Sequence, residues 1–564
     1  MRPFRREAER PECREHDVPR FLQLFELPRT QSSWSQLRAV TSRNRRPACS
    51  LVKLATLSLG LSIDEGERFV FGVIHTTVDG RLAHGAQEKA DDWFARVRTA
   101  PKIVIHFHGG LVPSREAQRS AEHLAPLYEG AGAAPAFFVW ESGLLEMLTK
   151  NLVRIGSDAL FKLLLWRTTK FASAKVGRQP AGARGLVFPT DIEVHTELSR
   201  SSAREPYADL EVRPDVTDLT GEEEYLFRAS LSEDRDLADI TNVLSNQSSA
   251  PRAAMSPGHE VDSPLLSPEI LETLEQEVHS NKGQRAVVSS AFFIGKGLRA
   301  LWRVTRRFQL RRDHGLYPTV VEELLREFYM ANAGGRVWTA MKERLRKAFA
   351  EDRSERGGTY LVSKLAELYA SGARPQITVV GHSAGAIAVM ELLARVRSWR
   401  DAGRLSPACT FENIAFLAPA CTVSDIARLL ESPYVEADGS GLYKNFRMYA
   451  LNDAMEASDV IVPGVYPRSL LYLVSGLFES GPSAESAWDV PLLGMQRFFD
   501  RPEVYCDDPI SSVRRFFDRE SARVVWSPSV SAAPGLLSDA RSHGGFVRDR
   551  LTLESVCHVI ERRL

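Results

Sequence analysis

The stretch Ile377-Thr378-Val379-Val380-Gly381-His382-Ser383-Ala384-Gly385 decides the fold of this chain. Its first four residues are apolar or β-branched and predict a buried strand, and the small residues from Ala384 onward predict a helix. Ser383 then lies on a sharp strand-to-helix turn, which lifts a serine hydroxyl above the edge of a sheet. Gly381 and Gly385 relieve clashes that a Cβ would cause in such a turn. We interpret Ser383 as a candidate nucleophile.

Strands and helices alternate on both sides of this stretch. Strands are expected at 69–74, 103–107, 136–140, 377–380, 413–417, 446–451 and 523–526, and helices at 87–97, 115–128, 359–369, 384–396 and 553–562. Such alternation predicts an α/β fold with a mostly parallel sheet and helices on both faces.

The alternation is interrupted between residues 142 and 354. Residues 144–166 have helical periodicity, 201–264 are rich in Ser, Pro and acids and predict a flexible loop, and 296–312 carry Lys and Arg without an acid. Because the insertion follows the strand at 136–140, near the sheet edge where ligands bind, we expect a mainly helical cap or lid.

The amphipathic stretches of this insertion have two interpretations. They could contact an anionic lipid surface, or their apolar side chains could pack on the core while the arginines form a solvated face. The second interpretation is favoured. Glu322-Glu323-Leu324-Leu325-Arg326-Glu327 is interpreted as a charged helix surface.

A second motif, His108-Gly109-Gly110-Leu111, follows the strand at 102–107. Acyl transfer requires backbone N–H groups aimed at a developing oxyanion, and a glycine loop brings backbone close enough to supply one. We expect the N–H groups of Gly110 and Ala384 to form this oxyanion hole, with His108 and Gly109 supporting the loop. Structural roles are favoured for His106 and His108, and no metal site is expected.

With these two motifs the chain resembles the α/β-hydrolase superfamily, in its serine esterase and lipase-like branch, over roughly residues 68–141 and 355–564. The stretches His314-Gly315-Leu316-Tyr317-Pro318-Thr319 and Ser469-Leu470-Leu471-Tyr472-Leu473-Val474 are similar to uncharacterised bacterial hydrolases of this kind. The resemblance implies an α/β-hydrolase fold and a triad of serine, acid and histidine in that chain order, with the acid after a late strand and the histidine after the last.

The acid and the histidine are chosen by their positions after strands. Asp453 ends the apolar run 447–451 and is our choice of acid, with Asp459 and Asp425 as rivals. His543 lies among small residues after the last strand and is favoured as the base, whereas His558 falls inside the closing helix.

Composition limits the remaining choices. The 564 residues include 72 basic and 72 acidic side chains and 44% hydrophobic residues, which excludes a general nucleic-acid binder and a disordered chain. The six cysteines form no CxxC pair, which argues against a zinc ribbon or a disulfide-stapled secreted domain. No uncharged apolar run reaches the length of a membrane span, so a cytoplasmic protein is expected, with peripheral membrane contact as an added expectation.

We therefore divide the chain into an arginine-rich arm (1–60), two core parts (61–141 and 355–564) and the insertion (142–354). The arm is expected to be poorly ordered, and a translation start placed too far upstream is an alternative explanation. The leading hypothesis is a cofactor-free serine hydrolase of a carboxylic ester, small or lipid-like. The alternatives are an amidase or peptidase with the same triad, and a non-catalytic, membrane-peripheral interaction protein.

Overall fold

The computed structural model describes residues 71–110, 113–140, 144–183, 185–200, 205–248, 265–280, 285–351, 355–430, 441–479, 488–531 and 533–561. The expected N-terminal arm lies outside these residues.

A parallel β-sheet forms the centre of the described chain. Its seven strands in the described residues are β1 (Gly72–Thr76), β2 (Lys102–Phe107), β3 (Ala134–Trp140), β4 (Gln376–His382), β5 (Phe411–Leu417), β6 (Tyr443–Leu451) and β7 (Val524–Ser527). They lie in the order β1-β3-β2-β4-β5-β6-β7, and every neighbouring pair is parallel. The predicted strands are confirmed, with shifts of a few residues at their ends, although residues 69 and 70 of the first predicted strand lie outside the described residues.

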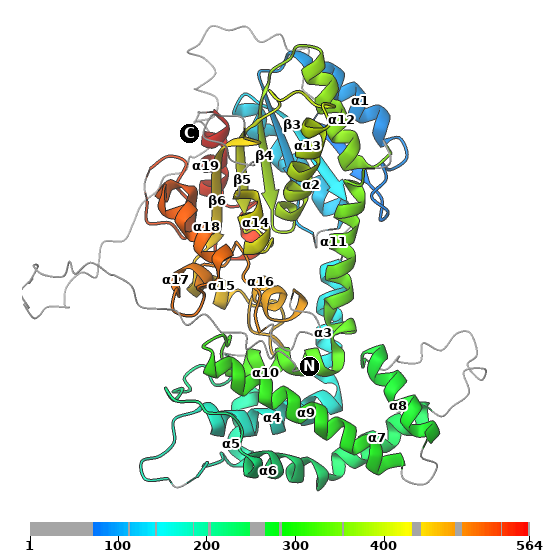
Figure 1. The fold of residues 1–564 in the computed structure, drawn as a ribbon, viewed down its shortest axis with the longest axis vertical. Coiled ribbons are helices and arrows are strands. Elements are labelled where there is room, and N and C mark those ends of the chain that lie inside the picture. The colour runs from blue at the N-terminus through cyan, green and yellow to red at the C-terminus, as the bar shows by residue number, and fades with distance from the viewer. Residues whose placement is uncertain are drawn as a thin grey trace, which may run out of the picture. The chain divides into compact units, whose positions relative to one another are not determined.

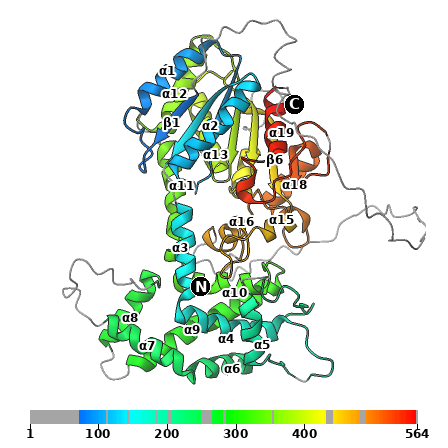
Figure 2. The ribbon, with the colours of Figure 1, turned by 180° about the vertical axis from the view of Figure 1, so that it is seen from behind.

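Helices cover both faces of this sheet. Alternate side chains of each strand point to opposite faces, and Ile105 and Val379 join one apolar cluster while Val104 and Val380 join another. Helices α1 (Ala86–Arg96), α12 (Gly357–Ala370) and α13 (Gly385–Asp401) pack with the first face, and α2 (Ser114–Gly130) and α19 (Arg550–Glu561) with the second. Figure 1 and Figure 2 show the two faces in turn. The α/β prediction is therefore confirmed at the level of a parallel sheet between helices.

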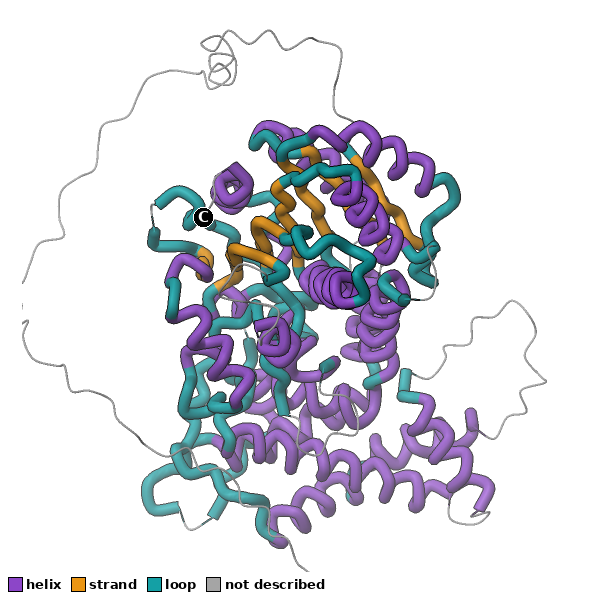
Figure 3. Tube along the Cα trace, turned by 45° about the horizontal axis from the view of Figure 1, so that its top comes forward, coloured by secondary structure: helices purple, strands orange, loops and turns teal. Residues whose placement is uncertain are grey.

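The segment between β3 and α12 is helical. Its helices in the described residues are α3 (Leu144–Ser157), α4 (Ala159–Val176), α5 (Asp191–Ser199), α6 (Gly221–Ser232), α7 (Arg235–Ser248), α8 (Pro268–Ser280), α9 (Arg285–Gln309), α10 (Leu316–Leu324) and α11 (Arg336–Ala348), with π-helical turns η4 (Leu325–Tyr329) and η5 (Ala331–Gly335). Figure 3 shows this dominance of helix over strand outside the sheet. The single helix expected at 144–166 is two helices, because Asp158 accepts a hydrogen bond from the Phe161 N–H and begins α4 there. Leu148, Leu152 and Ile155 of α3 are buried, as the favoured packing interpretation predicts.

The predicted flexible loop at 201–264 is wrong for its described part, because α6 and α7 lie within it. Thr220 accepts a hydrogen bond from the Glu223 N–H and the Glu223 carboxylate accepts one from the Thr220 N–H, a capping box that starts α6. Phe227 and Leu231 supply the buried face of α6, and Leu237 is buried in α7. The acidic composition obscured a capping signal and a helical apolar pattern.

The interpretation of 322–327 as a charged surface is also wrong. Glu322 and Glu323 are fully buried, as is Arg307 of the basic stretch, and Arg307 forms ion pairs with both carboxylates at 2.5 and 3.0 Å. Buried Arg303 pairs with Glu323 at 2.6 Å. These arginines stabilise the insertion from within and are not available to lipid headgroups.

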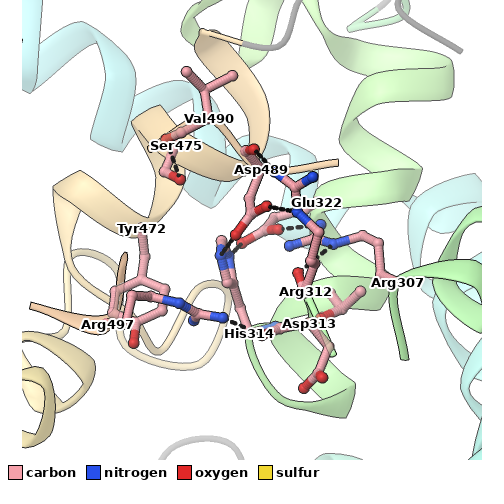
Figure 4. Close-up of polar contacts among 12 residues, drawn as sticks. Arg307, Arg312, Asp313, His314, Glu322, Tyr472, Ser475, Asp489, Val490 and Arg497 are labelled. Atoms are coloured by element: carbon pink, nitrogen blue, oxygen red, sulfur yellow. Dashed lines mark hydrogen bonds and ion pairs between the residues drawn. The ribbon is translucent and has the colours of Figure 1, made fainter. Parts of the chain in front are cut away.

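This ionic cluster also joins the insertion to the segment that follows β6 (Figure 4). His314 Nδ1 lies 2.8 Å from Glu322, and its Nε2 lies 3.8 Å from Asp489. Asp489 accepts a hydrogen bond from Arg312 at 2.5 Å, and Arg497 donates to the Asp313 carbonyl at 2.8 Å. The insertion and the later segment are therefore bound by buried charge as well as by apolar packing.

The chain after β5 completes the fold with short elements. These are α14 (Val423–Leu430), α15 (Asp453–Ser458), α16 (Leu470–Leu473), the π-helical turn η6 (Val474–Phe478), α17 (Arg497–Asp500), α18 (Asp508–Asp518) and the 3₁₀ turns η7 (Ser521–Arg523) and η8 (His543–Gly545). Among the helices of the described chain, we find none with the length and apolar character that crossing a lipid bilayer requires.

Candidate active site

Ser383 lies in the turn between β4 and α13 with a positive φ of 54°, a strained conformation for a residue with a Cβ. Two backbone hydrogen bonds hold the turn against the end of β5. The Ser383 N–H donates to the Leu417 carbonyl at 2.8 Å, and the Ala420 N–H donates to the Ser383 carbonyl at 3.1 Å. A Cβ on Gly385 would overlap the Phe107 carbonyl oxygen, so glycine permits α13 to begin against the end of β2. The predicted geometry of this turn is present.

The glycine loop after β2 lies beside this turn. Phe107 and Gly381 are register partners in the pairing of β2 with β4, so the residues that follow each strand emerge at the same edge. A Cβ on Gly110 would lie 2.6 Å from the Ala384 Cβ and would overlap Met341 Sδ of α11. In the described part of the chain neither the Gly110 nor the Ala384 N–H has a hydrogen-bond acceptor. Both predicted oxyanion donors thus lie together with unused N–H groups.

His108 orders that loop, as the structural interpretation predicts. Its Nδ1 donates to the Gly109 carbonyl at 2.7 Å, its Nε2 accepts from the Trp140 N–H at 3.1 Å, and its ring stacks on Trp140 at 3.9 Å. His106 contacts the Tyr128 hydroxyl at 2.9 Å on the other face of the sheet. Neither histidine points to the serine hydroxyl.

His543, in η8, lies next to the hydroxyl of Ser383. Its Nε2 lies 2.8 Å from the Ser383 Oγ, although 160 residues separate the two in sequence. Both side chains are buried, at 8% and 6% exposure. An Nε2 that accepts the serine proton requires the second nitrogen, Nδ1, to carry the hydrogen. That Nδ1 is buried and has no hydrogen-bond partner among the described residues.

The backbone of His543 is held on both sides. Its N–H donates to the Asp459 carboxylate at 2.6 Å, and its carbonyl accepts a hydrogen bond of 3.2 Å from His382 Nε2. His382, the residue before the candidate nucleophile, is a positioning residue that the sequence analysis missed. The only sequence signal was its position inside the turn motif.

The structure brings Asp459, not Asp453, to the histidine. Asp453, our choice from sequence, instead accepts a hydrogen bond from the Tyr472 hydroxyl at 2.8 Å and lies 3.5 Å from Arg501. The reason is local: Asn452 caps α15 through the Met455 N–H, so Asp453 becomes the first residue of that helix and Asp459 follows its last turn. Asp425 caps α14 with Thr422, and His558 lies in α19 beside Gly535, so neither joins the site.

Burial controls the charges of this site. It lowers the pKa of His543 to about 3, with His382 adding to the effect, and it lowers the pKa of His382 and of His108 to about 4. These rings are neutral at physiological pH, as a general base must be. Burial also raises the pKa of Asp459, against the effect of the hydrogen bond from the His543 N–H.

The residues that the structure describes contain no group of three or more His, Cys, Asp or Glu side chains arranged to hold a metal ion. The candidate site brings together one serine, one neutral histidine, a nearby carboxylate and two backbone N–H groups. We find no matching family model, curated protein or solved structure for this chain.

Proposed function

We propose that the protein is a serine hydrolase that cleaves a carboxylic ester through an acyl-enzyme intermediate. The observation that carries the proposal is the 2.8 Å approach of His543 Nε2 to the hydroxyl of Ser383, on a strained turn beside two unused backbone N–H groups. A serine of positive φ and a buried histidine Nδ1 without an acceptor among the described residues are costly to keep in a scaffold that performs no chemistry. The fold by itself carries no activity, so the proposal depends on this site.

The reaction would proceed in two halves. Ser383 Oγ attacks the ester carbonyl while its proton passes to His543 Nε2, and the N–H groups of Gly110 and Ala384 stabilise the oxyanion. The histidine proton then goes to the alkoxide that leaves, and an acyl group remains on Ser383. A water molecule gives its proton to His543, attacks the acyl carbonyl and releases the acid, and the proton returns to Ser383 Oγ.

Asp459 is our proposed third member of the triad. Its carboxylate already accepts a hydrogen bond from the backbone N–H of His543. The His543 Nδ1 is buried and has no acceptor in the described chain. Rotated to Nδ1, this carboxylate would hold the tautomer and stabilise the imidazolium. Hydrogen bonds in free enzymes often tighten only when substrate binds.

Labelling with a fluorophosphonate probe tests the nucleophile. We expect the native protein to be labelled and Ser383→Ala to be unlabelled, with Ser475→Ala as a matched control that removes another buried serine outside the site. Equal labelling of native protein and Ser383→Ala would reject Ser383. No labelling of a folded native protein would favour the non-catalytic alternative.

A series of p-nitrophenyl esters of increasing chain length, with a matching anilide series, then tests the substrate class. We expect the esters to be cleaved faster than the anilides. The lipid-like substrate and the membrane contact stay predictions: activity confined to short esters and unchanged by anionic vesicles would contradict both.

A further inference from the structure

Arg468 binds the loop that carries Asp459 from both ends. Its guanidinium Nη1 donates to the Ala457 carbonyl at 3.3 Å, two residues before Asp459. Its own carbonyl accepts a hydrogen bond of 3.0 Å from the Ile461 N–H, two residues after Asp459. One residue therefore spans the whole loop.

The same guanidinium is anchored in the helical insertion. It forms a two-point ion pair with Glu205, one contact of which is 2.9 Å long, and its Nε donates to the His314 carbonyl at 3.1 Å. Arg468 and Glu205 are mostly buried, at 15% and 13% side-chain exposure, so solvent screens this pair less than a surface pair. A planar guanidinium with donors on several edges can make all of these bonds at once, whereas an ammonium cannot.

The anchor itself is firm. The His314 ring lies between the buried carboxylates of Glu322 and Asp489 (Figure 4). The His314 N–H also donates to the Thr319 hydroxyl at 2.9 Å. The His314 carbonyl could not move without breaking these contacts. The insertion therefore holds in place the oxygen that accepts the hydrogen bond from Arg468 Nε.

We propose that Arg468 is a positioning residue through which the helical insertion sets the place of Asp459 against His543. The proposal rests on the proposed hydrolase function. In this proposal the insertion contributes to catalysis without moving as a lid. Glu205 and His314 hold Arg468, and Arg468 holds residues 457–461. Asp459 in that segment then binds the His543 backbone.

The rate constant for fluorophosphonate labelling measures this role without a known substrate. We expect Arg468→Ala to label about 10²-fold more slowly than the native protein, because small displacements of a catalytic constellation cost that much. Arg468→Lys, which keeps the charge, should recover part of the loss. Arg167→Ala is the matched control, since it breaks a partly buried ion pair with Asp234 inside the insertion and should label at the native rate.

A double-mutant cycle identifies the route. If Arg468 acts through Asp459, Asp459→Asn and the double variant Asp459→Asn/Arg468→Ala should label equally slowly. The inference would be overturned if the fold-loss in labelling rate of the double variant equalled the product of the two single losses. A folded Arg468→Ala that labels at the native rate would also overturn it. If Arg468→Ala does not fold, the same cycle is measured with Arg468→Lys. An unlabelled native protein would instead reject the proposed function.

Discussion

The carboxylate of Asp459 accepts a hydrogen bond from the backbone N–H of His543 at 2.6 Å. Asp453, six residues earlier, is turned away toward Tyr472 and Arg501. Two carboxylates at opposite ends of α15 thus differ in what they can do for the histidine, and the difference is open to direct measurement.

Asp459→Asn should therefore slow turnover of a p-nitrophenyl ester far more than Asp453→Asn. We expect a loss of about 10²- to 10⁴-fold for Asp459→Asn, because an amide in place of the carboxylate cannot stabilise the imidazolium. Asp453→Asn should lose less than about tenfold, since the residue contacts no reacting group. The reverse order would restore Asp453 as the acid.

Gly110→Ala should slow the labelling of Ser383 by about 10²- to 10³-fold in a protein that still folds. The new methyl group would overlap Met341 and press on Ala384, so the loop would withdraw its N–H from the oxyanion position. Loss of one such donor costs about 10²–10³ in rate. Gly130→Ala, at the end of α2 where a Cβ meets nothing within 4 Å, is the control and should keep the native rate.

Glu456→Gln should change how the stability of the protein depends on pH. Burial raises the pKa of Glu456 to about 8, with Asp459 and Asp453 adding to the effect of burial and the Ser469 hydroxyl opposing it. In the unfolded chain the group titrates near its ordinary value of 4.5. Between these values unfolding releases a proton, so the free energy of unfolding falls as pH rises, by up to about 1.4 kcal/mol per pH unit.

Urea unfolding at pH 5, 6.5 and 8 measures that slope. Glu456→Gln keeps a neutral side chain at every pH, so its stability should fall less steeply over this range than that of the native protein. Glu554→Gln, at an exposed ion pair with Arg550, should leave the native slope unchanged. Parallel curves for the native protein and Glu456→Gln would mean that the carboxyl is ionised in the folded state.

Arg307→Met should destabilise the protein by about 3–5 kcal/mol, because it leaves Glu322 and Glu323 buried with one cation fewer. Arg178→Met is the comparison, since Arg178 pairs with Glu211 at a well-exposed surface and should cost less than about 1 kcal/mol. Chemical denaturation of both variants gives the two values. Similar small losses would show that the cluster admits water.

The sheet and two of the site residues could be predicted from the sequence because their signals are local. Strands buried on both faces are continuous apolar runs, and Ser383 and His543 each follow such a run among small residues. The acid could not be chosen in the same way, because Asp453 and Asp459 both follow β6. Only the cap that Asn452 makes on α15 decides which of them turns toward the histidine.

The burial of the charged residues could not be predicted from the sequence, for a different reason. Glu322 and Glu323 pair with Arg307 of another helix, α9, and Glu323 also pairs with Arg326 of its own stretch. In sequence, a charged pair on an apolar helix looks the same whether it faces water or a partner on another helix. Whether the charged residues of α10 are buried or exposed becomes clear only when the position of the neighbouring helix is known. Arg468 and Glu205 are likewise far apart in sequence and meet only in the folded chain.

The pairing of Lys102 with Gln376 joins strands that lie on either side of the whole insertion. The entropic cost of closing a loop grows only with the logarithm of its length, so a long insert here costs little stability. Pairings so distant in sequence form slowly, however. The loop proposed to hold the oxyanion and the turn that carries Ser383 belong to opposite sides of that closure. The candidate site is therefore complete only once strands from both sides of the insertion have paired.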